Sequence, residues 1–240
     1  DGETAVIEMA VASGLELLDE DELDPMSATT YGTGELMKNA LDEGCKKMII
    51  GIGGSATNDG GCGMALALGA KFLDEEGNEI DHGGGSLGKL KSIDLSGLDT
   101  RLKDCRITVA ADVTNPLTGE DGAARVYAPQ KGAGEEQINR LEKNMKHFAE
   151  VVRDQLSKEI GEIPGAGAAG GLGAGLIVFA GAKIRPRFEV VSETVKLEEK
   201  VKEVDLVITG EGKIDRQTQF GKTHFGVDRI AKKYNKPVIA

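Results

Sequence analysis

Apolar runs and amphipathic stretches alternate along the chain. The runs at residues 47–52 (KMIIGI), 106–113 (RITVAADV) and 204–209 (VDLVIT) fit buried strands, and residues 237–240 begin another. Helical patterns lie between these runs. Strands that alternate with helices form parallel β/α layers. The sequence therefore predicts an α/β fold.

The clearest helical pattern begins at Glu135 and Glu136, whose charges favour the amino-terminal end of a helix. Its apolar face is formed by Leu141, Met145, Phe148, Val152 and Leu156. Shorter helical patterns occupy residues 34–41, 63–70, 171–180 and 226–234. Residues 71–82 (KFLDEEGNEIDH) instead predict a hairpin, with its turn at residues 76–78.

Composition narrows the class of partner. The 240 residues allow one large α/β domain or two small ones, and no apolar run reaches the roughly 18 residues of a membrane-spanning helix. A formal net charge of -11 argues against a nucleic-acid partner, which would require clustered Lys and Arg. We therefore expect small-molecule partners, with neither nucleic acid nor membrane. An anionic substrate would need a local site of backbone N–H groups, a metal or a few basic side chains.

The three cysteines, Cys45, Cys62 and Cys105, form neither a disulfide framework nor a metal-binding spacing. They suit a reducing cytosol, so a cytoplasmic location is expected. Cys62 lies in a glycine-rich segment and is either a nucleophile or, in the simpler interpretation, a small buried filler. The chain begins at Asp1 and ends within an apolar run, so we expect it to be part of a longer protein.

Many of the 34 glycines gather in four segments, at residues 51–63, 83–88, 165–175 and 210–226. Glycine lets the backbone approach a ligand closely and adopt a positive φ, as anion sites between strands and helices require. A tight turn explains any one segment equally well. Because three of them follow predicted strands and carry polar residues, we favour a shared ligand crevice.

Two glycine motifs resemble nucleotide-binding loops without meeting their requirements. Residues 221–223 (GKT) would end a P-loop, but Arg216 stands where that motif needs its first glycine. Residues 165–170 (GAGAAG) match the dinucleotide pattern, with Glu189 at about the spacing for a ribose contact. The preceding residues 157–164 lack the pattern of a buried strand. An NAD-dependent oxidoreductase is therefore the least favoured alternative.

Residues 51–61 (GIGGSATNDGG) connect a predicted strand to a predicted helix, which places N–H groups and the positive end of a helix dipole at the loop. Ser55, Thr57 and Asn58 offer hydrogen-bonding side chains. Asp59 could bind Mg²⁺ or accept a proton from a substrate hydroxyl. The alternative is that Asp59 caps the helix that follows.

A second polar segment follows the strand predicted at residues 106–113. Asp112 and Asn115 could face the same crevice as the 51–61 loop, or Asn115 could form an Asx turn before Pro116. Farther along, Lys131 is a candidate phosphate contact. The alternative for Lys131 is a position in a solvated loop.

A third polar segment, residues 209–218 (TGEGKIDRQT), follows the strand predicted at 204–209. It brings carboxylates and cations together in a glycine-rich turn: Glu211, Lys213, Asp215 and Arg216, with Lys222 nearby. Phosphoryl transfer needs this mixture, because a metal and cations neutralise the moving charge while a carboxylate orients the nucleophile. A surface cluster of salt bridges is the alternative.

Together these segments resemble the class I glycerate kinase family. The resemblance is carried by GIGGSATNDGG at 51–61, ADVTNPLTGEDGAARVYAPQKGA at 111–133, PGAGAAGGLGAG at 164–175 and TGEGKIDRQTQFGK at 209–222. It extends over essentially all 240 residues. The family's amino-terminal segment and the carboxyl-terminal end of the same lobe have no counterpart in this chain.

The resemblance implies a two-lobe α/β architecture with the active site between the lobes. Residues 1–200 would form an inserted lobe with a mixed sheet, and residues 201–240 would be the returning part of a flavodoxin-like lobe. The implied reaction is ATP-dependent phosphorylation of D-glycerate with Mg²⁺, with 2-phosphoglycerate favoured over 3-phosphoglycerate as product. The 240 residues alone are expected to be inactive, and homo-oligomerisation is left open.

The motifs of the family supply the candidate site. We assign Asp215 or Asp59 as the carboxylate that orients or deprotonates the hydroxyl, with Lys222 as a catalytic cation. Glu211 and Asp112 are the candidate Mg²⁺ ligands. The candidate residues for binding substrate or nucleotide are Gly53, Gly54, Ser55, Thr57, Asn58, Asn115, Lys131, Gly167, Gly170, Gly171, Lys213 and Arg216. A non-catalytic module that binds nucleotide or hydroxy acid is the main alternative.

Overall fold

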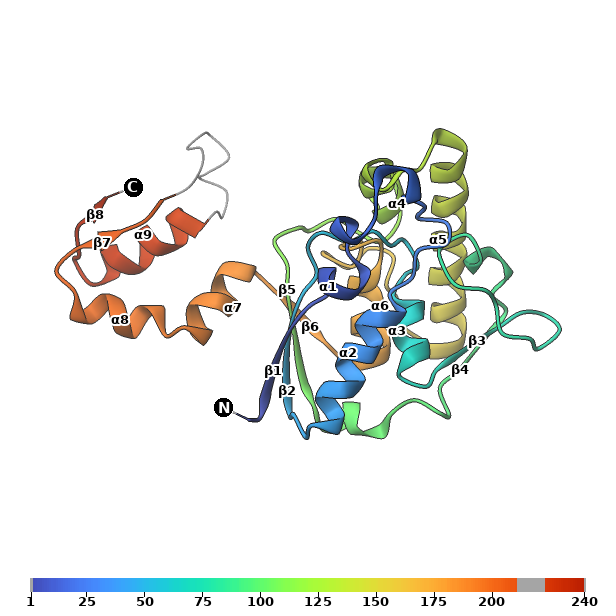
Figure 1. Cartoon of the computed structure of the whole chain (residues 1–240), viewed down its shortest axis with the longest axis horizontal. Helices are drawn as coiled ribbons and strands as arrows, with labels where there is room; N and C mark the ends of the chain where they lie inside the picture. The colour runs from blue at the N-terminus through green and yellow to red at the C-terminus, as the bar shows by residue number, and fades with distance from the viewer. Residues whose placement is uncertain (1, 211–222, 240) are drawn as a thin grey trace. The chain divides into compact units, whose positions relative to one another are not determined.

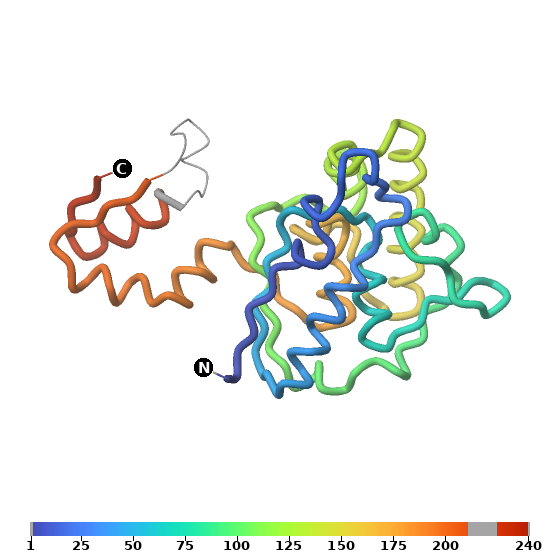
Figure 2. Tube along the Cα trace, viewed as in Figure 1, coloured from blue at the N-terminus to red at the C-terminus, as the bar shows by residue number. Residues whose placement is uncertain are grey.

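The structure is a computed structural model that describes residues 2–210 and 223–239 (Figures 1 and 2). It divides into two compact units, Asp1–Ile184 and Arg185–Ala240. The lobe boundary predicted at residue 200 falls within α8 (Leu197–Glu203) of the second unit. The assignment of residues 1–200 and 201–240 to two lobes stays a prediction.

A four-stranded sheet, in the order β1-β2-β5-β6, organises the first unit. Its strands are β1 (Thr4–Glu8), β2 (Lys47–Gly51), β5 (Arg106–Ala110) and β6 (Lys183–Arg185). β2 runs parallel to both β1 and β5, with Gly51 opposite Glu8 on one side and Ala110 on the other. The predicted parallel α/β fold is therefore confirmed. β5 ends at Ala110 rather than at residue 113, which leaves Asp112 in the loop beyond the strand.

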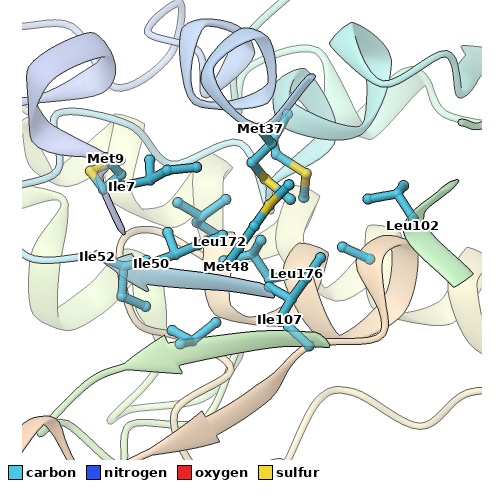
Figure 3. Close-up of a cluster of buried hydrophobic side chains, with 14 of the residues drawn as sticks. Ile7, Met9, Met37, Met48, Ile50, Ile52, Leu102, Ile107, Leu172 and Leu176 are labelled. Carbon is cyan, nitrogen blue, oxygen red and sulfur yellow. The ribbon is translucent and has the colours of Figure 1, made fainter. Parts of the chain in front are cut away.

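One face of this sheet is covered by helices. Alternate residues of the strands, such as Met48, Ile50 and Ile107, are buried on that face. They pack in one cluster with Met37 of α2 (Tyr31–Asp42) and Leu176 of α6 (Leu172–Ala180) (Figure 3). The burial of alternate positions identifies a sheet that is packed on one side.

A second core forms around α5 (Glu135–Leu156), the longest helix that the structure describes. Of the predicted apolar face, Leu141, Met145, Phe148 and Val152 are buried, and Leu156 is partly buried. α3 (Cys62–Ala67) and α6 contribute to the same core. Phe179 of α6 makes an edge-on contact with Phe72, at a distance of 5.5 Å between ring centroids. The helix predicted from the apolar pattern is therefore confirmed.

The hairpin predicted at residues 71–82 is present, although its returning arm is too short to form a named strand. β3 (Lys71–Leu73) pairs antiparallel with β4 (Ser92–Asp94). The predicted turn does exist, because Asp74 Oδ1 accepts hydrogen bonds from the N–H groups of Glu76 and Asn78. The returning chain forms an antiparallel bridge with β3, and the N–H of Ile80 donates to the carbonyl oxygen of Phe72 at 2.9 Å. β4 is therefore a second partner of β3.

The connections of the first unit contain several short elements. They are α1 (Ala10–Ser13), η1 (Leu15–Leu17), η2 (Glu20–Glu22), η3 (Leu87–Lys89), η4 (Thr100–Asp104), α4 (Ala123–Tyr127) and η5 (Pro129–Lys131). Within the described part of the chain, no helix is both long and apolar enough to cross a membrane.

The second unit has its own small core. It contains α7 (Arg187–Thr194), α8, β7 (Val207–Ile208), α9 (Thr223–Lys233) and β8 (Val238–Ile239). The two strands are parallel, and Val207 joins Val201, Val227 and Ala231 in the core. On the opposite strand face, Ile208 and Ile239 lie side by side and are 75% and 56% exposed. The strands predicted at 204–209 and 237–240 are present but shorter.

Candidate active site

The carboxyl ends of β2 and β5 form one edge of the sheet, because Gly51 lies opposite Ala110. Three predicted site residues, Gly53, Gly54 and Asp112, are exposed just beyond these ends. A methyl group added at Gly53 would meet nothing within 4 Å, so the space over this turn is open. Ligands of open parallel sheets gather beyond the carboxyl ends of the strands. The structure thus brings these three residues to the expected edge.

The rest of the 51–61 loop turns into the protein. Ser55, Thr57 and Asn58 are buried, and the hydrogen bonds of the loop are made internally. The N–H of Thr57 donates to Ser55 Oγ at 3.1 Å, and the N–H of Gly60 donates to the carbonyl oxygen of Gly170 at 3.1 Å. N–H groups that are paired in this way are not available to an anion. Within this loop, the exposed turn at Gly53 and Gly54 therefore remains the candidate for binding an anion.

Asp59 lies at the centre of a hydrogen-bonding network and is 1% exposed. Its carboxylate accepts bonds from the N–H groups of Gly61 and Gly63, at 3.0 and 3.2 Å, at the start of α3. It also accepts from the N–H of Thr30 at 2.8 Å and from Thr30 Oγ1 at 2.9 Å. These contacts fit the helix-capping alternative. The role of Asp59 as a base stays a prediction, and its carboxylate has almost no exposed surface to offer a substrate.

Cys62 lies beside this carboxylate and is buried. Burial raises the pKa of the Cys62 thiol well above its usual value, and the negative charge of Asp59 raises the pKa further. A thiol that stays protonated is a poor nucleophile. The structure therefore favours the interpretation of Cys62 as a small buried filler.

Lys131 is the buried cation of the site and is 1% exposed, so its placement in a solvated loop is wrong. Its Nζ donates to the carbonyl oxygen of Thr57 at 2.6 Å and to Ser55 Oγ at 3.4 Å. Burial lowers the pKa of Lys131 to about 7, and the negative charge of Asp59 opposes this shift. A direct phosphate contact stays a prediction, and a phosphate would have to reach a side chain that has almost no exposed surface.

Asn115 holds the segment that follows β5. Its Nδ2 donates to the carbonyl oxygen of Asp121 at 2.8 Å, and its Oδ1 accepts from the Tyr127 hydroxyl at 2.6 Å. Its backbone carbonyl accepts from the N–H of Gly167 at 3.0 Å. Asn115 therefore links this segment to α4 and to the 165–175 glycines. Its predicted contact with a ligand remains a prediction.

The glycines of the 165–171 turn allow backbone to pack against backbone. A methyl group added at Gly167 would lie 2.0 Å from the carbonyl oxygen of Pro116, and one at Gly170 would lie 1.9 Å from that of Thr57. At Gly171 it would lie 2.8 Å from a backbone atom of Gly60. This packing explains why the three positions are glycine, whereas their predicted role in ligand binding stays untested.

The context that a dinucleotide fingerprint requires is missing. Residues 157–164, all of which the structure describes, contain no strand before the turn. The backbone carbonyls of Pro116 and Thr57 occupy the space next to Gly167 and Gly170. This arrangement does not support the NAD alternative.

One exposed side chain at this edge was not anticipated from the sequence. Glu8 ends β1, and its carboxylate oxygens lie 2.9 and 3.0 Å from where a methyl group on Gly51 would be. Glycine at position 51 therefore leaves room for the Glu8 side chain across the sheet. The short apolar run of residues 5–7 (AVI), which fits a strand directly before Glu8, is the signal that could have revealed Glu8.

The remaining candidates lie outside the described residues. They are Glu211, Lys213, Asp215, Arg216 and Lys222. Their catalytic, binding and metal-binding roles stay predictions.

Comparisons with known proteins give a consistent result. A family model described as "Glycerate kinase family" matches residues 1–240. The chain is 56% identical over 239 residues to "Glycerate 2-kinase" of Escherichia coli (strain K12), and 54% identical over 240 residues to "Glycerate kinase" of Halalkalibacterium halodurans. Each match covers 100% of this chain and 63% of the relative. The chain thus spans less than two thirds of the length of these relatives.

The fold has a match among solved structures. The crystal structure of a putative glycerate kinase 2 from Salmonella typhimurium LT2 superimposes with a TM-score of 0.92 at 53% sequence identity. The match covers 98% of this chain and 63% of that one. The similarity is therefore one of sequence as well as of architecture.

Proposed function

Because the chain belongs to the glycerate kinase family, we propose that the complete protein transfers a phosphoryl group from ATP to D-glycerate. The observation that carries this proposal is the match along the whole chain, at up to 56% identity, to proteins named as glycerate kinases. The relative with that identity is named as a glycerate 2-kinase, which supports 2-phosphoglycerate as the product. ATP dependence and the position of phosphorylation belong to the proposal.

In the proposed reaction, the glycerate hydroxyl attacks the γ-phosphorus of ATP in line with the bond to the leaving ADP oxygen. The new oxygen–phosphorus bond forms as the old one breaks, and a carboxylate takes the hydroxyl proton. We assign that carboxylate to Asp215, because Asp59 is saturated with hydrogen bonds. Lys213, Arg216 and Lys222 would hold phosphate or the glycerate carboxylate.

Mg²⁺ would be held by Asp112 and Glu211. Asp112 fits this role, since an exposed carboxylate at the strand end supplies the oxygen ligand that Mg²⁺ prefers. Within residues 2–210 and 223–239, no group of three or more Asp, Glu, His or Cys side chains is placed to hold a metal ion. Mg²⁺ is commonly held by one or two carboxylates and by substrate phosphates. When bound, Mg²⁺ neutralises charge on the phosphates.

The location and the lobes complete the proposal. A cytoplasmic location is supported by the three cysteines, all of which are free thiols. Residues 1–200 would belong to the inserted lobe and residues 201–240 to the flavodoxin-like lobe.

The test uses the protein expressed from its complete reading frame. ADP release is measured with MgATP in the presence and absence of D-glycerate, and the phosphorylated product is identified by phosphorus NMR. We expect release that depends on D-glycerate and on Mg²⁺, with 2-phosphoglycerate as the product. A 3-phosphoglycerate signal would correct the position of transfer.

Two outcomes would overturn the kinase proposal. Tight binding of MgATP or D-glycerate without turnover would indicate the non-catalytic module. Binding of NAD with no binding of MgATP, measured by calorimetry, would indicate the oxidoreductase.

A further inference from the structure

Lys131 reaches the glycine-rich loop from inside the protein. It ends η5, and the next residue, Gly132, has a φ of +91°. A methyl group at Gly132 would lie 2.6 Å from the carbonyl oxygen of Leu23, so the backbone beside Lys131 is closely packed. The side chain extends from this fixed point to the carbonyl oxygen of Thr57, 2.6 Å from Nζ. Its position is therefore fixed at both ends.

The ammonium group of Lys131 donates hydrogen bonds to the segment directly after the exposed turn. Ser55 Oγ accepts from Nζ at 3.4 Å and from the N–H of Thr57 at 3.1 Å. On the other side of the chain, the carbonyl oxygen of Gly54 accepts from the N–H of Leu15 at 2.8 Å. The Gly53-Gly54 turn is thus held on one side by backbone and on the other by a buried cation.

A charge in this position needs an explanation. Burying an ammonium group is unfavourable unless hydrogen bonds and an opposite charge compensate for the loss of water. An apolar side chain could fill the same space without that penalty. Burial lowers the pKa of Lys131, and the charge of Asp59 partly opposes that shift. Both of the hydrogen bonds described for Lys131 go to residues of the loop. Its contacts therefore point to a role in shaping the loop.

We propose that Lys131 is a positioning residue: by fixing Thr57 and Ser55, it holds the exposed Gly53-Gly54 turn in the conformation that receives an anionic substrate. The role differs from a direct phosphate contact, because Lys131 acts through the loop and stays buried. Its catalytic consequence rests on the proposed kinase function. Its structural consequence, an ordered loop, does not.

The test compares Lys131→Met with Lys158→Met in the protein from the complete reading frame. Methionine keeps the length of the side chain and removes the charge. Lys158 is a matched control, because its Nζ also donates to a backbone carbonyl oxygen, that of Val178 at 2.7 Å, but it is exposed and outside the candidate site. Amide hydrogen exchange of a peptide covering residues 53–60 and steady-state kinetics are measured for both variants.

We expect Lys131→Met to speed exchange in residues 53–60 by about fivefold or more, because the loop opens more often. The KM for glycerate or for MgATP should rise by about fivefold or more while kcat changes by less than about threefold, since binding common to the ground and transition states is lost. Lys158→Met should change neither quantity. A variant that merely weakened the fold would lower the amount of active enzyme without changing KM.

Unchanged exchange in residues 53–60 of Lys131→Met would overturn the proposal, whether or not the enzyme turns over. If the unmodified protein shows no glycerate-dependent ADP release, the proposed function fails while exchange still decides the role of Lys131. Should Lys131→Met not fold, Ser55→Ala carries the test, because it removes a shared acceptor of Nζ and of the Thr57 N–H. Unchanged exchange and KM in Ser55→Ala would then overturn the proposal.

Discussion

The two halves of the 51–61 loop have opposite environments. Gly53 and Gly54 are exposed at the end of β2, whereas the residues from Ser55 to Asp59 are buried and hydrogen-bonded within the protein. Both halves belong to one glycine-rich motif, and both carry features expected of a ligand site. The difference teaches that one such motif can combine an exposed glycine turn, which is open to a ligand, with buried polar residues that fix its backbone. Burial and hydrogen-bond partners separate the two groups.

Of the two candidate carboxylates, Asp59 belongs to the buried half of the loop, and Asp215 lies outside the described residues. We expect Asp215→Asn to lower kcat by about a hundredfold or more, or about 2.7 kcal/mol of barrier, because a carboxylate that orients the hydroxyl acts mainly in the transition state. The melting temperature should hardly change. Steady-state kinetics and a melting curve of the complete protein check both points.

A surface salt bridge at Asp215 would behave differently. Its loss would change stability by up to about 1 kcal/mol and leave kcat untouched. If kcat falls by less than about threefold in a folded protein, Asp215 is not the catalytic carboxylate.

Gly170, which packs against the buried half of the loop, and Gly53, in the exposed half, should tolerate a side chain very differently. Gly170 has a φ of +64°, and its added methyl group would lie 1.9 Å from the carbonyl oxygen of Thr57. We expect Gly170→Ala to lower the free energy of unfolding by roughly 2.5 kcal/mol, from backbone strain and overpacking. Gly53→Ala is the matched control, with nothing within 4 Å of its methyl group. Denaturant unfolding of both variants tests this, and equal losses would contradict the comparison.

We expect Asp59→Asn to lower stability, whereas we expect Asp215→Asn to lower kcat. The amide keeps the size of the side chain but removes the charge and replaces one acceptor with a donor that faces the N–H groups of Thr30, Gly61 or Gly63. We expect the free energy of unfolding to fall by roughly 2 kcal/mol. In the folded fraction, kcat should stay within about threefold of the unmodified value. A large loss of kcat at unchanged stability would restore Asp59 as a base.

The fold was predictable where the information is local. The apolar runs of β2 and β5 and the apolar face of α5 follow from periodicity alone, since each element shows its own pattern. β1 was missed because its apolar run, residues 5–7, is shorter than those of β2 and β5. The hairpin at residues 71–82 followed from its local turn, but the pairing of β3 with β4 could not be predicted, because it joins segments that are not adjacent along the chain.

The candidate site was predictable in its location more than in its roles. Motifs placed glycines and polar residues at the strand ends, and the capping alternative for Asp59 followed from its position before a helix. The partners of these residues could not be foreseen, because they come from distant segments. Thr30 lies 29 positions from Asp59, and Lys131 lies 74 positions from Thr57. No pattern within one segment shows that such residues meet inside the fold.

The smallest expected effect concerns the charge that Lys131 keeps buried. Its pKa is lowered to about 7, against a usual value of 10.5, so between these pH values the unfolded chain binds a proton that the folded protein does not. Stability must then rise with pH across this window, because the unfolded state binds more protons. Below about pH 7 both states bind the proton, so this group no longer makes stability depend on pH. From pH 6 to pH 8 the free energy of unfolding should increase by about 1.4 kcal/mol from this group.

Urea unfolding across that range should show the rise in the unmodified protein and a smaller rise in Lys131→Met, with Lys158→Met as the control. An identical pH dependence in all three proteins would mean that the Lys131 ammonium is not buried as its contacts with Thr57 and Ser55 require.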